Sequence, residues 1–117
     1  MTVIVCNVRG FNDPLKQKRV MARRRSINAK VVCLLETRVK ENNSRSIIDH
    51  HFQGWGWLHN YSEAYNGRIW VLWHDQVSVD LMDTTAQCIS YSIKMSSNQF
   101  YMSIVYGYNE GLARRSL

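Results

Sequence analysis

Two nearly all-apolar runs rich in β-branched residues lie in the first third of the chain, Val3-Ile-Val-Cys-Asn7 and Val31-Val-Cys-Leu-Leu35. Runs of this length and composition are typical of strands that are buried on both faces. Between them, Asp13 can cap a helix that has Pro14 at its first position, and we expect this helix from Leu15 to about Ile27. The strand–helix–strand order predicts that the two strands are neighbours in one sheet.

The predicted helix has an unusual apolar stripe. Val20, Met21 and Ile27 supply apolar surface, but Arg23 and Arg24 fall where residues facing the core are expected. Either the helix packs with little apolar area, or the stem of an arginine lies along the core while its charged end reaches water.

The rest of the chain is predicted to consist mainly of strands. A polar turn at Asn42–Asn43 and a helix capped by Ser44 and ending at Phe52 come first. The strands that follow are expected at 55–59, 69–73, 77–81, 89–93 and 100–106, and a loop at 107–109 precedes a helix that begins at Glu110. This order predicts an α+β fold of layers around stacked sheets.

The composition is that of a globular domain with a basic surface. The chain has 117 residues, with 15 Lys and Arg against nine Asp and Glu, a net charge of +6. This charge favours polyanionic partners, nucleic acid first, but a merely solvated basic surface stays equally open. No apolar stretch has membrane-spanning length, and three cysteines without paired spacing favour a reducing, intracellular setting.

Asn7 and Glu36 each stand where an apolar strand stops. Polar groups at such strand ends are common at the rim of a sheet, where ligands bind. A carboxylate at a rim suits Mg²⁺, which prefers oxygen ligands and keeps waters and substrate phosphates around it. The alternative at this point is that each polar residue simply ends its strand.

The aromatic residues and histidines have plainer interpretations. The four tryptophans are expected mainly in the core, with base stacking as the alternative. The histidines, His50, His51, His59 and His74, are predicted to be exposed to solvent, and the strand before His74 is expected to lead towards the rim that holds Glu36.

Four motifs in the chain together resemble the endonuclease/exonuclease/phosphatase superfamily, and among its members most closely the endonuclease domain of plant non-LTR (LINE-type) retrotransposons. The motifs are Val5-Cys-Asn7-Val-Arg-Gly10, Cys33-Leu-Leu-Glu36-Thr-Arg38, Gly67-Arg-Ile-Trp-Val-Leu-Trp73 and Ser103-Ile-Val-Tyr106-Gly-Tyr-Asn109. The resemblance implies a four-layer α/β/β/α sandwich. It implies that Glu36 is the main metal ligand with Asn7 beside it, and that Tyr106 and Asn109 contact the scissile phosphate. It also implies Mg²⁺, with Mn²⁺ as an alternative, a DNA substrate and action on nuclear DNA.

The chain departs from the superfamily pattern in what it lacks. The Gly-Asp-x-Asn and Ser-Asp-His segments, which carry the carboxylate that activates water and the catalytic histidine, do not occur in this sequence. Residues 1–117 are therefore expected to be a partial domain, the N-terminal half of the sandwich, inactive in hydrolysis alone. Two alternatives remain open: a non-catalytic module that binds nucleic acid through its basic surface, and a degenerate remnant without function.

Overall fold

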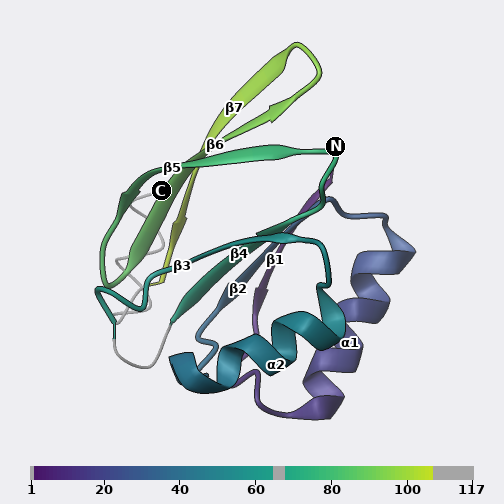
Figure 1. The fold of residues 1–117 in the computed structure, drawn as a ribbon, viewed down its shortest axis with the longest axis vertical. Coiled ribbons are helices and arrows are strands. Elements are labelled where there is room, and N and C mark those ends of the chain that lie inside the picture. Colours follow the sequence, from purple (N-terminus) through teal and green to yellow (C-terminus); the bar gives the residue numbers. More distant parts are fainter. Residues whose placement is uncertain (1, 65–67, 107–117) are drawn as a thin grey trace.

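The computed structural model describes residues 2–64 and 68–106 (Figure 1). The elements in these ranges are β1 (Val3–Asn7), α1 (Pro14–Ser26), β2 (Val31–Leu35), α2 (Glu41–His51), β3 (Gly56–His59), β4 (Ile69–Trp73), β5 (Ser78–Thr84), β6 (Cys88–Met95) and β7 (Asn98–Val105). The predicted strands are present, with changes at their ends. The loop and helix expected after Tyr106 lie outside the described residues. In the described part, neither helix is both long enough and apolar enough to cross a membrane.

Sheet A brings the two apolar runs together. Its strand order is β1-β2-β4-β3, and β1 and β2 are parallel neighbours, as predicted. Asn7 pairs with Leu35, so both strands end at the same edge of the sheet. β4 runs antiparallel to β2 and begins at that edge, because Ile69 pairs with Leu35.

β1 and β2 differ in how deeply they are buried. β2 is buried on both faces, as expected, but the same prediction for β1 is wrong. β1 is an edge strand among the described residues, and Val5 on it is 51% exposed. The apolar composition of a strand does not reveal whether neighbouring strands cover it.

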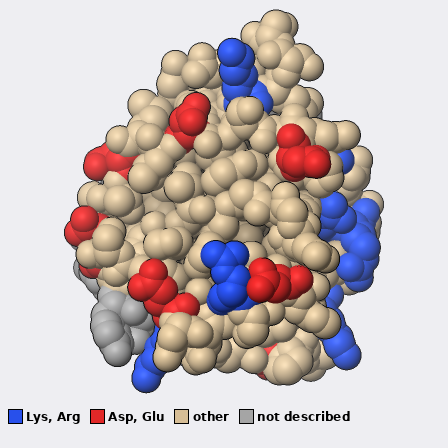
Figure 2. All heavy atoms as spheres, viewed as in Figure 1, with Lys and Arg blue, Asp and Glu red and all other residues tan. Residues whose placement is uncertain are grey.

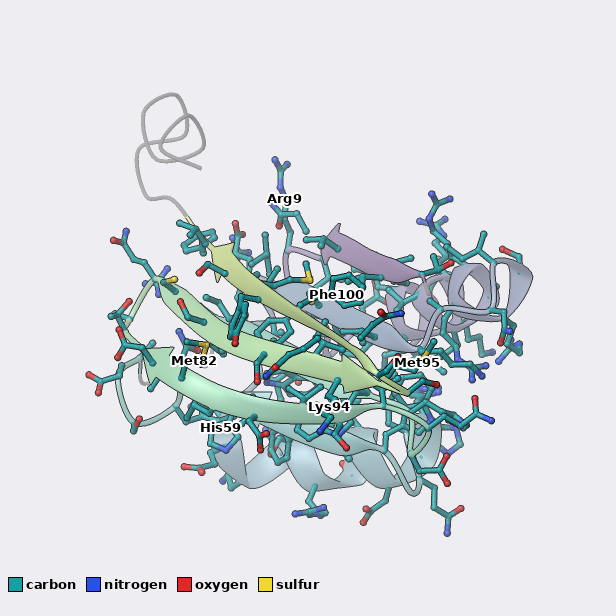
Figure 3. All side chains as sticks on the ribbon, turned by 90° about the horizontal axis from the view of Figure 1, so that it is seen from above. Arg9, His59, Met82, Lys94, Met95 and Phe100 are labelled. Atoms are coloured by element: carbon teal, nitrogen blue, oxygen red, sulfur yellow. The ribbon has the colours of Figure 1, made fainter. Side chains whose placement is uncertain are left out.

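The helices and sheet B cover opposite faces of sheet A. Alternation along β2 separates two cores, since Val32 and Leu34 pack on the side of α1 and α2, whereas Val31 and Cys33 pack on the side of sheet B, β5-β6-β7. The layers are therefore helices, sheet A and sheet B (Figures 1 and 3). This confirms the mixed fold with two stacked sheets, and the described residues form three of the four expected layers.

Sheet B is an antiparallel meander with one buried face. Ile89, Tyr91 and Ile93 on β6 are fully buried against sheet A, as their alternation predicted. Leu81, expected to be half-buried in the same way on β5, is 47% exposed. The reason is local: β5 is an edge strand, and its register with β6 shifts between Leu81 and Asp83.

Helix α1 begins as the sequence predicted. The side chain of Asp13 accepts a hydrogen bond from the backbone nitrogen of Leu15 at 2.9 Å, and Pro14 starts the helix. Its inner face is small, because besides Gln17 only Val20 and Met21 are buried. The guanidinium carbon of Arg24 lies 4.9 Å from the centre of the Trp55 ring. The first expected solution, a small buried apolar area, therefore occurs. The second differs from the expectation, because the Nε of Arg24 is buried and does not reach water.

Helix α2 begins earlier than predicted. It starts at Glu41 after the cap residue Lys40, so Ser44 lies inside the helix and not at its cap, and the predicted turn at Asn42–Asn43 is helical. The Ser44 hydroxyl donates to the carbonyl oxygen of Glu41 at 2.6 Å, which satisfies it within the helix. Glu41 in the first turn favours this start because its charge complements the helix dipole.

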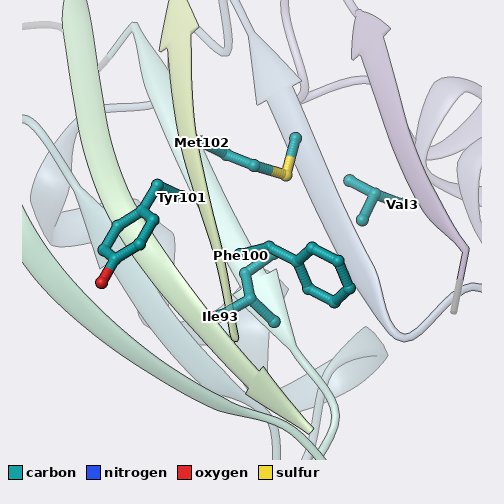
Figure 4. Close-up of a pocket in the computed structure, with 5 residues that line it drawn as sticks. All are labelled: Val3, Ile93, Phe100, Tyr101 and Met102. Carbon is teal, nitrogen blue, oxygen red and sulfur yellow. The ribbon is translucent and has the colours of Figure 1, made fainter. Parts of the chain in front are cut away.

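One side of the sandwich is open between β1 and β7. A groove of about 300 Å³ lies there, lined by Val3, Ile93, Phe100, Tyr101 and Met102 (Figure 4). Phe100 is 48% and Tyr101 67% exposed, and β7 carries no charged residue. Among the described residues β7 pairs only with β6. An uncharged, partly apolar strand edge of this kind is prone to pair with another chain.

Candidate active site

The ends of β1 and β2 form one continuous edge, at which Asn7 and Glu36 are brought together. The backbone nitrogen of Val8 donates to the carbonyl oxygen of Leu35 at 3.0 Å, and that of Gly10 to the carbonyl oxygen of Glu36 at 2.8 Å. Asn7 is exposed and pairs with Leu35, the residue before Glu36. The two predicted metal-site residues therefore lie at the same rim.

The start of β4 adds an arginine to this edge. The backbone nitrogens of Glu36 and Thr37 both donate to the carbonyl oxygen of Arg68, at 2.5 and 3.3 Å. The Arg68 guanidinium carbon lies 5.3 Å from the centre of the Tyr106 ring. Since Tyr106 directly follows β7, this contact joins the edge of sheet A to sheet B.

Glu36, Arg38 and Tyr106 interact through their side chains. Arg38 forms an ion pair with the Glu36 carboxylate, whose side chain is only 12% exposed, whereas that of Arg38 is 63% exposed. Burial raises the pKa of Tyr106, and so does the Glu36 carboxylate, through its charge and through a hydrogen bond with the phenol; Arg68 and Arg38 oppose the shift. Tyr106 therefore stays a neutral hydroxyl donor at and above neutral pH.

The electrostatic balance of the edge favours an anion. Arg9, Arg38 and Arg68 come from three different segments, and Glu36 is the single carboxylate among these four side chains. Figure 3 shows Arg9 pointing outward beyond the end of β1. Arg38 pairs with the Glu36 carboxylate and Arg68 lies over the Tyr106 ring, and a guanidinium group can contact two oxygens of a phosphate at once.

The backbone at this edge is strained. Arg9, Glu36 and Arg38 have positive φ angles of 47°, 61° and 54°. Residues other than glycine rarely adopt this left-handed conformation, and such residues concentrate at functional sites, where surrounding structure holds them. The tight hydrogen bonds between residues 8–11 and 35–37 provide that restraint here.

A buried amide supports the edge from behind. Asn60 is fully buried. Its side-chain oxygen accepts from the backbone nitrogens of Arg68 and Ile69 at 3.2 and 3.1 Å, and its side-chain nitrogen donates to the carbonyl oxygens of Thr85 and Ala86 at 3.2 and 3.1 Å. Asn60 therefore links the start of β4 to the turn between β5 and β6, and connects sheet A to sheet B next to the site.

The donor set fits a loosely held metal ion. Among residues 2–64 and 68–106, no group of three or more His, Cys, Asp or Glu side chains gathers at one place. Glu36 with the amide of Asn7 fits Mg²⁺, which commonly binds through one or two carboxylates and keeps waters and substrate phosphates as its other ligands. The ion pair with Arg38 competes for the Glu36 carboxylate, so a metal ion bound there would have to displace the Arg38 guanidinium.

Two further predicted residues are Asn109 and His74. Asn109 lies outside the described residues. His74 is at the opposite edge from Glu36, because β4 is antiparallel to β2 and its last residue, Trp73, pairs with Val31. The expectation that His74 approaches the rim of Glu36 is therefore wrong.

Of the four histidines, His50 is exposed as predicted, whereas His51, His59 and His74 are partly buried. His59 is half-buried between the rings of Trp57 and Tyr61, with ring centres 4.6 and 4.9 Å away. His51 contacts the side-chain oxygen of Gln17 at 2.9 Å. The tryptophans confirm the core interpretation, since Trp70 is fully buried and Trp55 and Trp57 pack against the helix-side core.

Two contributors to the site were missed from the sequence. Arg68 stands within the motif Gly67-Arg-Ile-Trp, which was noted only for its apolar strand, and its place directly before an apolar run was the available signal. Asn60 follows the short strand β3, where a buried asparagine has no local sequence signature.

Two solved structures share this fold. The endonuclease domain of TRAS1, a telomere-specific non-LTR retrotransposon, matches 97% of the chain with a TM-score of 0.70 and 13% identity. The AP endonuclease LMAP from Leishmania major matches 97% of it with a TM-score of 0.65 and 12% identity. The chain spans 49% and 42% of these two chains, about half of their length.

Comparisons at the level of sequence find nothing further. No protein-family model matches the chain, and no curated protein does. The structural likeness therefore carries the assignment: the chain has the fold of the retrotransposon and AP endonuclease structures, as its motifs predicted from their resemblance to the endonuclease/exonuclease/phosphatase superfamily.

Proposed function

We propose that this chain is part of a divalent-metal-dependent DNA endonuclease domain of retrotransposon origin, in which Glu36 holds the metal ion. The observation that carries the proposal is the convergence of the Glu36 carboxylate, the Tyr106 phenol and the Arg68 guanidinium at one strained edge, from three separate segments. The shared fold with two endonucleases supports it. We also propose that this endonuclease domain is of the plant LINE type.

Each side chain has a role that follows from its chemistry. Glu36 supplies the anionic ligand and Asn7 an amide oxygen beside it. Arg9, Arg38 and Arg68 neutralise the charge on the phosphate oxygens. Mg²⁺, when bound, supplies a Lewis acid that polarises the phosphoryl group.

Tyr106 and Asn109 are the proposed contacts to the scissile phosphate. The phenol of Tyr106 has a raised pKa and so donates a hydrogen bond to a phosphate oxygen at neutral pH. Neither residue can abstract a proton from water efficiently at that pH. Because the sequence has no Gly-Asp-x-Asn or Ser-Asp-His segment, residues 1–117 alone should bind metal and DNA but not hydrolyse DNA.

Metal binding can be tested by the paramagnetic resonance signal of free Mn²⁺, titrated into the protein in the presence of inorganic phosphate. The wild-type chain should bind one Mn²⁺, and Glu36→Gln should lose it. The matched control is Asp75→Asn, an exposed carboxylate beside His74 at the opposite edge of sheet A, which should bind like wild type. Equal binding by wild type and Glu36→Gln would refute the proposed metal site.

The variant Arg38→Gln distinguishes a metal-binding role of Glu36 from a purely structural one. Arg38→Gln removes the cation that competes for the carboxylate, so the affinity for Mn²⁺ should rise. A fall in affinity would mean that Arg38 positions Glu36 and does not compete with the metal.

Three measurements separate the proposal from its alternatives. Under the proposal, the wild-type chain binds Mn²⁺ through Glu36 but nicks plasmid DNA with Mg²⁺ no faster than the Glu36→Gln variant. A non-catalytic binding module would bind DNA without any Mn²⁺ binding that depends on Glu36. A degenerate remnant would show no cooperative unfolding transition at all.

A further inference from the structure

Helix α1 carries a concentration of positive charge that helix stability does not explain. Six of its thirteen residues are basic, namely Lys16, Lys18, Arg19, Arg23, Arg24 and Arg25, and none is acidic. The last three complement the helix dipole, but Lys16, Lys18 and Arg19 lie in the first half, where a positive charge opposes it. Arg19 and Arg23 are four residues apart and repel each other.

None of these cations has an acidic partner in the part of the chain that is described. The ion pairs there join Arg38 to Glu36, Arg45 to Asp49 and His74 to Asp75, all outside α1. Lys18, Arg19, Arg23 and Arg25 are exposed. Figure 2 shows Lys and Arg gathered on the flank where α1 lies in Figure 1.

The exposed cations form two rows along the outer face of α1. At 100° per residue, Lys18 and Arg25 fall on one flank, and Arg19 and Arg23 on the other, with exposed Leu15 and Ala22 between them. The rows lie about 10 Å apart across the helix, close to the roughly 12 Å width of the major groove of DNA. Cations on both flanks can thus reach phosphates on the two sides of one groove.

We propose that the outer face of α1 is a second DNA-binding surface, which contacts the phosphate backbone of a duplex without reading its sequence. The stripe between the rows consists of Leu15, Ala22 and Ser26. Ser26 is its one hydrogen-bonding side chain, and the Ser26 hydroxyl donates to the carbonyl oxygen of Arg23 at 2.9 Å. The choice of DNA over other polyanions rests on the proposed function.

This surface is continuous with the candidate active site at one end only. The side-chain nitrogen of Lys16 donates to the carbonyl oxygen of Arg9 at 2.8 Å, so α1 begins beside the edge that holds Glu36. Its other end leads to the start of β1, because the backbone nitrogen of Lys30, four residues after the helix, donates to the carbonyl oxygen of Thr2 at 3.1 Å. The helix, about 20 Å long, therefore leads away from the cleavage edge along the side of the protein.

The test measures DNA binding without metal, so that its outcome is independent of catalysis. Fluorescence anisotropy of two unrelated 20-base-pair duplexes is recorded in EDTA over a series of NaCl concentrations. The variant Lys18→Gln/Arg19→Gln/Arg23→Gln is compared with Lys40→Gln/Arg45→Gln/Lys94→Gln, which removes three exposed cations elsewhere. Arg25 is kept because its charge acts on His51.

The α1 variant should weaken binding to both duplexes at least tenfold and reduce the slope of log affinity against log salt by about 3, since each phosphate contact contributes about 0.9. The control should change that slope by less than about 1. Equal losses in the two variants would show a general charge effect and overturn the proposal, as would tighter binding to phosphatidylserine vesicles than to DNA. Both variants are measured in EDTA with Glu36 unchanged, and the metal site is tested separately by Mn²⁺ binding, so failure of the metal site leaves this result intact.

Discussion

Replacing Asn60 by alanine should destabilise the protein strongly, although Asn60 makes no contact with solvent or substrate. The side chain makes four hydrogen bonds that join the start of β4 to the turn between β5 and β6. Asn60→Ala would leave the backbone nitrogens of Arg68 and Ile69 and two carbonyl oxygens of that turn without these partners.

The size of the effect follows from the number of bonds. A hydrogen bond contributes about 0.5–1.5 kcal/mol net, so the loss of four should lower the free energy of unfolding by about 4 kcal/mol. For a domain of this size the melting temperature should fall by roughly 15 °C. Asn60→Asp keeps the two accepted bonds but replaces the two donated ones with a buried negative charge, so it should be destabilised as well.

Urea denaturation followed by tryptophan fluorescence measures the change. The matched control is Asn43→Ala, an exposed asparagine on α2, which should stay within about 0.5 kcal/mol of wild type. If Asn60→Ala unfolds at the wild-type urea midpoint, the amide does not hold the two sheets together as described.

Three further outcomes are expected. Burial lowers the pKa of His51 and His59 below the ordinary 6.5, so the unfolded chain takes up protons before the folded chain does. The free energy of unfolding should therefore fall as the pH drops below 6.5. Urea midpoints that stay constant between pH 7.5 and 5 would contradict this. Arg24→Met should raise the free energy of unfolding by about 1 kcal/mol, because it removes the buried Nε of Arg24, which has no hydrogen-bond partner. This gain should outweigh the lost contact between the Arg24 guanidinium and the Trp55 ring. A lower free energy of unfolding in Arg24→Met would show that the ring contact dominates. Phe100→Glu should reduce self-association through the open edge of β7 in sedimentation velocity, and unchanged association would place the contact elsewhere.

The position of the candidate site was predictable because it depends on local features. Asn7 and Glu36 each follow an apolar strand, and a short helical crossover makes parallel neighbours of the two strands, so their ends had to meet. The cap at Asp13 and the start of α1 were predictable for the same reason, since cap and helix are adjacent in the sequence.

The features that the sequence did not predict correctly depend on contacts between distant residues. Whether β1 is covered depends on the order of strands in sheet A, which no single run of residues encodes. Arg68 reaches the site because β4 is antiparallel to β2, and the same direction carries His74 to the opposite edge. The partners of Asn60 at the turn after β5 lie 25 and 26 residues away.

Paramagnetic broadening by Mn²⁺ in the proton–nitrogen NMR spectrum tests the central claim most directly, because it locates the ion on the protein. Substoichiometric Mn²⁺ should broaden the backbone amides of Asn7, Glu36 and Tyr106 first, affect those at the far end of α1 least, and have no such effect in Glu36→Gln. Broadening centred on another carboxylate, such as Asp80 or Asp83 on β5, with the amide of Glu36 unaffected, would contradict the assignment of this edge as the metal site.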